Sequence, residues 1–208
     1  MLKDIVVVGP LGVNCYLLGC PETGQGVVVD PGGDVELILS AIARHGLTVT
    51  AIINTHGHFD HVGGNRQLVE ATGAPLWIHS ADEPLLTRVA SVAAMYGMRG
   101  ENSPLPSGHL VDNQQLVYGA CSLRVIHTPG HTPGGCCLYL EDEGKLITGD
   151  TLFADGIGRT DLPGGSYEQL LESIRTRLFC LPDEVALYPG HGPASTIGHE
   201  KQFNPYLD

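Results

Sequence analysis

Basic residues are scarce in this sequence. Eleven Lys and Arg residues stand against 23 Asp and Glu residues, so the formal net charge is −12 at pH 7. Proteins that bind the nucleic-acid backbone use clustered cations to neutralise its phosphates. We therefore expect no nucleic-acid partner.

Long apolar runs are also missing. No run approaches the roughly 20 residues that a membrane-spanning helix requires. The first ten residues lack the charged region, the apolar stretch and the small-residue cleavage site of a signal peptide. The six cysteines form no C-x-x-C pair, which favours buried, reduced thiols. Together these absences predict a cytoplasmic protein with no membrane partner.

The composition is that of a folded globular chain. Hydrophobic residues make up 42% and charged residues 16%, with a mean hydropathy of +0.06, which excludes a disordered chain and a coiled coil. A chain of 208 residues can bury a core without disulfides, so we expect one domain over residues 1–208. The 28 glycines and 10 histidines indicate functional loops, because glycine permits tight turns and histidine is the commonest metal ligand.

The first half of the chain alternates short strands with helices. Apolar and β-branched residues predict strands over residues 4–8, 14–18, 26–29, 49–53 and 75–78. A helix is predicted between Asp34, as its N-cap, and Gly46. Two more helices are predicted, from Val62 to Gly73 and over residues 85–96. Residues 97–113 are rich in Gly, Pro, Ser and Asn and predict a connecting loop.

The second half repeats this order of elements. Strands are predicted over residues 122–126, 136–140, 145–148 and 185–188. Ser166 and Gln169 form a capping-box signature for a helix, and a short last helix is predicted to end before Pro205. Two strand-rich halves with interleaved helices predict an α+β fold in which two sheets pack face to face and helices cover their outer faces.

The densest group of candidate functional side chains is Thr55-His56-Gly57-His58-Phe59-Asp60-His61, directly after the apolar strand. Four potential metal ligands within residues 56–61 exceed what capping or surface polarity would place on one turn. His56 and His58 alternate along an extended turn and are predicted to face one centre. Asp60 and His61, at the start of the next helix, are predicted to reach a second centre nearby.

Three further candidates lie just past predicted strands, each in a glycine-flanked loop: His131, Asp150 and His191. Loops at the carboxyl ends of strands are where α/β architectures build their sites, so we expect all seven side chains to converge on one cleft. Five imidazoles and two carboxylates suit two divalent ions better than one. Asp150 lies outside the first cluster and is the predicted bridge between them.

The H-x-H-x-D-H segment at residues 56–61, followed by His131, Asp150 and His191, resembles the metallo-β-lactamase superfamily. The resemblance covers nearly the whole chain and implies a four-layer αββα sandwich with a dinuclear metal cleft. Carried over by position, it implies that His56, His58 and His131 hold metal 1 and that Asp150 bridges the two metals. It assigns to metal 2 the remaining ligands, which are Asp60, His61 and His191.

Three glycine-containing segments are most similar to the glyoxalase II group, especially its short bacterial single-domain relatives. They are Val29-Asp30-Pro31-Gly32-Gly33, Thr128-Pro129-Gly130-His131-Thr132-Pro133-Gly134 and Tyr188-Pro189-Gly190-His191-Gly192-Pro193. Full-length glyoxalase II enzymes carry a C-terminal helical domain that helps to hold glutathione. Only residues 192–208 follow His191 here, so we expect that domain to be absent and the thioester to be held differently.

The expected mechanism follows from the two ions. A water that bridges two divalent cations loses a proton near neutral pH and supplies a hydroxide nucleophile. A thioester suits such a site, because its thiolate leaves without a strong general acid. We therefore expect hydrolysis of a small, glutathione-derived thioester, S-lactoylglutathione, to lactate and glutathione. Asp60 is the predicted catalytic residue, since it both ligates metal 2 and accepts a hydrogen bond from the hydroxide. Zinc is the predicted metal, with iron or manganese as alternatives.

Residues around the predicted ligands have two interpretations each. Arg159 is predicted to bind a substrate carboxylate, and the alternative is an internal ion pair with a nearby acid such as Asp161. Thr55 and Asp30 are expected either to orient metal ligands or to make ordinary turn hydrogen bonds.

Other functions share this ligand pattern. A persulfide dioxygenase of the same fold would use one iron held by the equivalents of His56, His131 and Asp150. The segment that follows the aspartate ligand in such dioxygenases resembles Gly158-Arg159-Thr160-Asp161 of this chain. A lactonase of the same fold and a metal-binding module without turnover are further alternatives. His191 and the complete first cluster favour hydrolysis, because they leave ligands for a second ion.

Overall fold

The computed structural model describes residues 1–207 of the chain, and its strands form two six-stranded sheets and one small hairpin. The first sheet has the order β1-β2-β3-β4-β5-β6. Its strands are β1 (Leu2–Val8), β2 (Val13–Gly19), β3 (Gln25–Val29), β4 (Thr48–Ile53), β5 (Leu76–His79) and β6 (Gly108–Leu110). The strands from β1 to β3 pair antiparallel, and those from β3 to β6 pair parallel.

The second sheet has the order β14-β13-β10-β9-β8-β7. Its strands are β7 (Gln115–Tyr118), β8 (Cys121–His127), β9 (Cys136–Leu140), β10 (Lys145–Gly149), β13 (Ala186–Pro189) and β14 (Ser195–Thr196). All its neighbours pair antiparallel except β10 and β13. The separate hairpin consists of β11 (Leu152–Phe153) and β12 (Gly156–Ile157).

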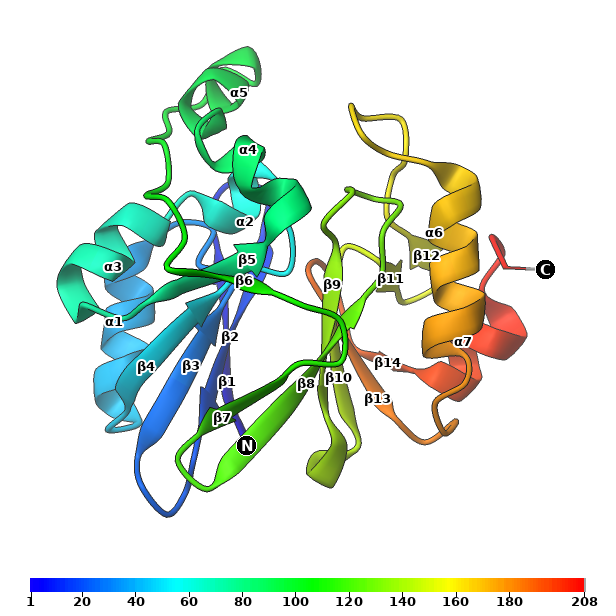
Figure 1. Cartoon of the computed structure of the whole chain (residues 1–208), viewed down its shortest axis with the longest axis horizontal. Helices are drawn as coiled ribbons and strands as arrows, with labels where there is room; N and C mark the ends of the chain where they lie inside the picture. Colours follow the sequence, from blue (N-terminus) through cyan, green and yellow to red (C-terminus); the bar gives the residue numbers. More distant parts are fainter. Residues whose placement is uncertain (208) are drawn as a thin grey trace.

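Helices cover both outer faces of the paired sheets (Figure 1). The first sheet is covered by α1 (Val35–Arg44) and α3 (Asn65–Thr72), and the second by α6 (Tyr167–Ser173) and α7 (Ile197–Phe203). The helices at one end of the sandwich are α2 (Phe59–Val62), α4 (Glu83–Leu86) and α5 (Val89–Met95). Short 3-10 turns at Ser80–Asp82 and Glu141–Glu143 and a π-helical turn at Ile174–Leu178 complete the elements.

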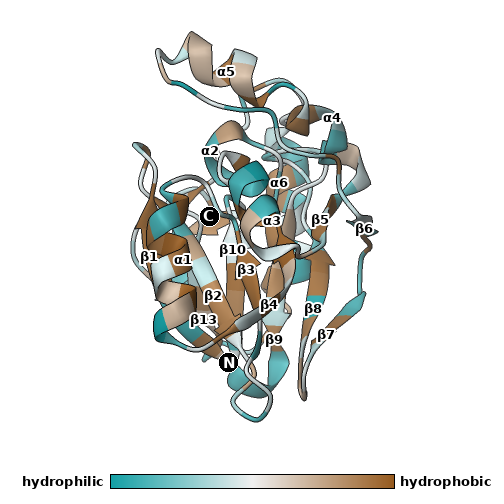
Figure 2. Cartoon of the chain, turned by 90° about the vertical axis from the view of Figure 1, so that its left-hand side faces the viewer, coloured by the Kyte–Doolittle hydropathy of each residue, from teal (hydrophilic) through white to brown (hydrophobic). Residues whose placement is uncertain are grey.

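Three apolar layers explain why the chain adopts four structural layers. One layer lies between α1 and the first sheet, one between the two sheets, and one between the second sheet and α6. β2 is buried along its whole length, because Cys15 and Leu17 pack toward the helices while Tyr16 and Leu18 pack toward the other sheet. Figure 2 shows largely hydrophobic strands, with hydrophilic segments on the helices and turns. The predicted αββα sandwich is therefore confirmed.

The predicted elements are mostly correct, but β7, β11, β12 and β14 were not predicted, and the helix predicted from Val62 to Gly73 is divided into α2 and α3. There are three further differences. Residues 85–96 form two short helices, because Thr87 and Arg88 interrupt α4 and α5. The predicted loop over residues 97–113 contains β6, whose Gly108 pairs with Trp77 of β5. Asp34 stands at the N-cap position of α1, but its side chain makes no capping bond and instead accepts a hydrogen bond from the Gly9 N–H at 2.8 Å.

Two predicted helix boundaries are confirmed. Ser166 caps α6 by accepting a hydrogen bond from the Gln169 N–H, and α7 ends before Pro205. No helix within residues 1–207 is both long enough and apolar enough to cross a membrane.

Candidate metal centre

The loop after β4 carries the first cluster of polar side chains. His58 is extended, and α2 begins at Phe59, so Asp60 and His61 lie on the first turn of a helix. A side chain at Gly57 would approach the Cβ atom of Leu85 to 2.8 Å, so only glycine permits this tight turn.

The first group of converging side chains contains His56, His58 and His131, and we call it the three-histidine group. Their ligand atoms all lie within 4.8 Å of one another. The Nδ1 atom of His58 lies 2.8 Å from the Nε2 atom of His131. His131 comes from the loop after β8, and its Nδ1 atom donates to the Arg159 carbonyl at 2.7 Å, so its Nε2 lone pair faces the other two rings.

The second group contains Asp60, His61 and His191, and we call it the mixed group. Its ligand atoms also lie within 4.8 Å of one another. The Nε2 atoms of His61 and His191 are 3.2 Å apart, and the Oδ2 atom of Asp60 lies 3.4 Å from the His191 Nε2 atom. His61 donates from Nδ1 to Asp30, and His191 donates from Nδ1 to the Leu11 carbonyl. Both Nε2 atoms therefore face the same centre.

Asp150, in the loop after β10, lies between the two groups. Its carboxylate is 3.4 Å from the His61 Nε2 atom, 3.6 Å from that of His131 and 3.7 Å from that of His191. Gly190 permits this approach, because a Cβ atom there would lie 2.2 Å from Asp150 Oδ1. The structure thus brings together all seven side chains that the sequence predicts as ligands.

Two buried atoms of this cluster have no hydrogen-bond partner within residues 1–207. They are the Nε2 atom of His56 and the Oδ1 atom of Asp150. A buried polar atom without a partner costs about 1–3 kcal/mol, so such atoms call for an explanation. Imidazole nitrogens about 3 Å apart must share a proton or a cation between them. A set of imidazole and carboxylate donors with unpaired lone pairs fits divalent transition metals.

The two groups differ in their protonation. Burial, followed by the neighbouring histidines, lowers the pKa of His56 well below its usual range and lowers that of His58 to about 4. Burial also lowers the pKa of His131. Burial acts the same way on His61 and His191, but nearby carboxylates outweigh it and raise both pKa values.

Both carboxylates of the cluster are held in their charged form. Burial alone would raise the pKa of Asp60 and of Asp150. At Asp60 the hydrogen bond from His191 and the charge of His61 together outweigh burial, and at Asp150 the interactions with His61, His131 and His191 together do, so both pKa values lie below the usual range.

Asp30 and Thr55 make the orienting contacts that the sequence left open. Asp30 accepts hydrogen bonds from the Thr55 N–H at 2.7 Å, the Thr55 hydroxyl at 2.6 Å and His61 Nδ1 at 3.0 Å. The Thr55 hydroxyl also lies 3.1 Å from His56 Nδ1. Asp30 therefore connects both groups.

Sequence reasoning missed two further supporting residues. Asp82 is fully buried and accepts hydrogen bonds from the Gly57 N–H, the Thr132 hydroxyl and the Gly134 N–H at 2.7–2.8 Å, so it ties the His58 loop to the His131 loop. Asn14 donates from Nδ2 to the carbonyls of Pro189 and Gly192, on either side of His191. Asp82 follows β5 just as Asp30 follows β3, so the strand-end rule would have flagged it.

Arg159 forms the internal ion pair that was one of its two interpretations. Its Nε and terminal nitrogen atoms each lie 2.9 Å from an Asp161 carboxylate oxygen. Its role in substrate binding stays a prediction. The remaining histidines have partners elsewhere: His45 pairs with Asp4, His109 with Glu83 and His199 with Asp155, while His79 stacks on His127.

The comparisons with known proteins agree with this geometry. Residues 8–193 match the family described as "Metallo-beta-lactamase superfamily". The hydroxyacylglutathione hydrolase GloC of Haemophilus influenzae is 36% identical over 208 residues, which cover 99% of this chain and 97% of the relative.

Two solved structures resemble the whole chain. The B3 metallo-beta-lactamase BLEG-1 has a TM-score of 0.92 at 35% identity and covers 100% of this chain and 99% of its own. TTHA1623 in a di-iron-bound form has a TM-score of 0.91 at 38% identity and covers 99% of this chain and 100% of its own. The shared fold, the family match and the alignment with relatives over nearly the whole length lead to one conclusion: this chain belongs to the metallo-β-lactamase superfamily.

Proposed function

We propose that this protein is a dinuclear metal-dependent hydrolase of a small thioester. The proposed reaction is of the glyoxalase II type, from S-lactoylglutathione to lactate and glutathione, in the cytoplasm and by a single domain over residues 1–208. The observation that carries the proposal is the convergence of two ligand groups around Asp150, with two buried atoms left unpaired. The similarity to a hydroxyacylglutathione hydrolase supports the choice of substrate.

The proposed ligands follow the two groups. The three-histidine group would hold one ion, the mixed group would hold the other, and Asp150 would contact both. When bound, such ions convert water to a hydroxide near neutral pH and stabilise negative charge on an acyl oxygen. Zinc is the proposed metal, with iron or manganese as the alternatives, and the di-iron form of a similar structure supports iron.

The residues of the chain would orient the ligands and position the attacking water. The Nδ1 protons of three ligands are fixed by Asp30 for His61, the Leu11 carbonyl for His191 and the Arg159 carbonyl for His131, so the Nε2 lone pairs point inward. Asp60 stays ionised, because its pKa is lowered, and one of its oxygens would accept a hydrogen bond from the attacking water. The thiolate would leave without help from a general acid.

Arg159 is the proposed substrate-binding residue. Its guanidinium lies at the surface and is held by the exposed Asp161, so the pair exchanges readily with solvent. Its carbonyl contacts His131, which places the residue beside the centre. A substrate carboxylate would replace Asp161 as the bidentate partner of the guanidinium.

Metal analysis of wild-type protein and of the His191→Ala variant tests the ligand assignment. The variant should fall from two ions per chain toward one, and an unchanged stoichiometry would remove His191 from the site. Metal-free protein should gain S-lactoylglutathione hydrolysis when metal is added back.

Assays on the same sample separate the other reactions of this fold. Oxygen consumption with glutathione persulfide, without thioester cleavage, would show that the protein is a dioxygenase and not a hydrolase. Turnover of lactones or β-lactams at a higher kcat/KM than any thioester would also overturn the proposal.

A further inference from the structure

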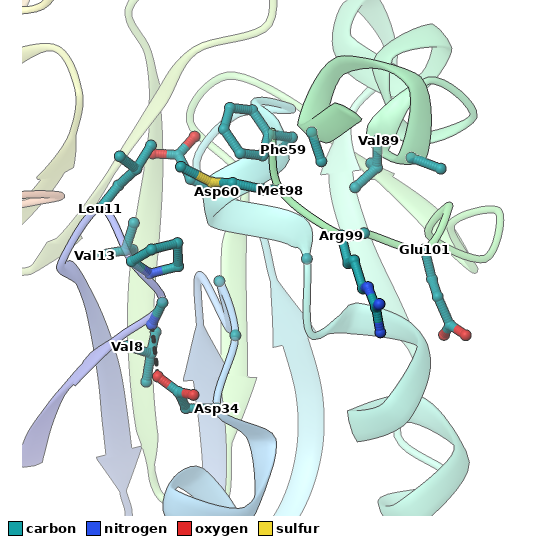
Figure 3. Close-up of a pocket in the computed structure, with 18 of the residues that line it drawn as sticks. Val8, Leu11, Val13, Asp34, Phe59, Asp60, Val89, Met98, Arg99 and Glu101 are labelled. Atoms are coloured by element: carbon teal, nitrogen blue, oxygen red, sulfur yellow. Dashed lines mark hydrogen bonds between the residues drawn. The ribbon is translucent and has the colours of Figure 1, made fainter. Parts of the chain in front are cut away.

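A cavity of about 710 Å³ lies beside the metal centre (Figure 3). Its walls come from the β1–β2 turn, the loop after β3, the first turn of α2, α5 and the segment after α5. Asp60 lines this cavity and also belongs to the mixed group. The cavity therefore borders the metal centre at Asp60.

The walls of the cavity are mainly apolar. Figure 3 shows Val8, Leu11 and Val13 on one side, with Phe59, Val89 and Met98 toward α5. Alanines at positions 90, 93 and 94 of α5 also line the cavity and keep it wide. Cavities of about 300–1,000 Å³ with apolar walls and few polar groups bind small organic ligands. The lining thus favours a hydrocarbon chain.

The charges at the cavity disfavour glutathione as its occupant. Asp34, Asp60 and Glu101 line it, and Arg99 is the cation beside them. Glutathione carries two carboxylates, one ammonium and two polar amides and is negative overall. Its carboxylates would face three carboxylates here, and its amides would find apolar walls in place of hydrogen-bond partners. A lactoyl group has only three carbon atoms and would leave most of the volume unfilled.

We propose that this cavity binds the acyl group of the substrate, and that the protein also hydrolyses thioesters of apolar acyl chains longer than the lactoyl group. The inference rests on the proposed hydrolase function and extends its substrate class beyond S-lactoylglutathione. Water forms a new C–O bond at the acyl carbon as the C–S bond breaks. The fatty acid leaves through the cavity, and the thiolate takes up the proton released by the attacking water.

A chain-length series tests this proposal with one constant thiol. Metal-loaded protein is assayed with acetyl, butyryl, hexanoyl and octanoyl thioesters of N-acetylcysteamine. Each methylene buried from water contributes up to about fourfold, so kcat/KM should rise at least about tenfold from acetyl to octanoyl. A flat or falling series would overturn the assignment of the cavity.

Variants on α5 test whether the dependence of kcat/KM on acyl chain length arises in this cavity. Ala94 is exposed and lines the cavity, so Ala94→Trp fills it without disturbing the core; Ala90→Trp is a second obstruction from the preceding turn. Ser91→Trp is the matched control, because Ser91 lies on the same helix outside the lining. The obstructing variants should lose at least about tenfold with octanoyl and stay within about twofold with acetyl. Equal losses with both substrates would contradict the proposal.

Binding separates a failure of this inference from a failure of the hydrolase function. The S-octyl thioether of N-acetylcysteamine cannot be hydrolysed and should bind at least about tenfold tighter than the S-ethyl thioether, with the difference lost in Ala94→Trp. If none of the thioesters in the series is cleaved but the octyl thioether binds in this way, the proposed hydrolase function is wrong and the assignment of the cavity to the acyl chain stands. If thioesters are cleaved but the octyl thioether binds no tighter than the ethyl one, the cavity assignment fails alone.

Discussion

The two ligand groups at the centre differ in charge although they share one pocket. The three-histidine group contains no carboxylate, and burial lowers the pKa of each of its imidazoles. The mixed group contains Asp60, and carboxylates raise the pKa of both its imidazoles. The first group is therefore neutral near pH 7, whereas the second holds protons that a metal must displace.

The groups also differ in how the fold supports them. Asp82 ties together the loops of His58 and His131, while Asp30 accepts from His61 and Asn14 holds both sides of the His191 loop. Each group thus has its own orienting residues, while Asp150 lies beside histidines of both groups and Asp30 reaches the three-histidine group through Thr55. Because the two groups have different supporting residues, we expect that variants can perturb the two ions separately.

The largest effect is expected from Asp150→Asn, because this residue lies beside histidines of both groups. Loss of its charge removes the attraction to His61, His131 and His191 at once. We expect kcat/KM for S-lactoylglutathione to fall by more than about a hundredfold, beyond the roughly 10–100-fold typical of an orienting residue. Steady-state kinetics with metal analysis would measure it, and metal content should fall below two ions per chain.

Asp183→Asn is the control for this variant. Asp183 is an exposed acid that pairs with Lys201, so its replacement should change neither activity nor metal content. An Asp150→Asn protein with two ions and full activity would show that the two groups do not depend on a shared carboxylate.

Asp82→Asn and Asp30→Asn are expected to weaken different ions, because Asp82 supports the loops of the three-histidine group whereas Asp30 bonds His61 directly and reaches His56 only through Thr55. Asp82→Asn should weaken binding of the ion at the three-histidine group by about 10–100-fold, and Asp30→Asn should weaken the ion at the mixed group by as much and the other ion by less. Competition titrations with a chelating dye give both affinities for each variant. Equal weakening of the same ion by both variants would contradict separate support.

The sequence predicts the first cluster well, because its four ligands lie within residues 56–61 and the flanking glycines leave them one tight turn. His131, Asp150 and His191 are single residues in separate loops. They are predictable only because each follows a strand and the strand ends meet at one edge of the sandwich. The resemblance to a known family adds the assignment of His131 to one group and of His191 to the other, which spacing alone does not give.

The position of Asp82 after a strand could have been noted from the sequence, but the contacts of the supporting residues could not be predicted, because they cross between segments far apart in the chain. Asn14 contacts Pro189 and Gly192, and Asp82 contacts Gly134, through pairings that only the packed sheets create. The strand β6 was not predicted for a similar reason. Its residues have only a weak local preference for a strand, and their pairing with β5 determines the structure.

Metal affinity should depend on pH at one group only. The histidines of the three-histidine group have lowered pKa values and are neutral imidazoles near pH 7, so affinity there should change little with pH. The raised pKa values of His61 and His191 mean that acidification restores protons that compete with the metal. Affinity at the mixed group should fall about tenfold per pH unit for each proton displaced. Titrations at pH 6, 7 and 8 measure this, and parallel pH dependence at both groups would contradict the division.

The smallest effect is expected at the edge of the mixed group, in the loop of His191. Asn14→Leu keeps the size of the side chain but leaves the buried Pro189 carbonyl and the Gly192 carbonyl without its amide donors. This should cost about 1–3 kcal/mol of unfolding free energy and lower affinity at the mixed group by less than about tenfold, because the Asn14 N–H still holds Gly190. Tyr16→Phe is the matched control, since it removes a hydroxyl bond to the same Pro189 carbonyl while Asn14 remains in place. Chemical denaturation of metal-free protein and metal titration of both variants give the two quantities. If Tyr16→Phe weakens metal binding as much as Asn14→Leu does, the β2 strand as a whole, and not the amide of Asn14, positions His191.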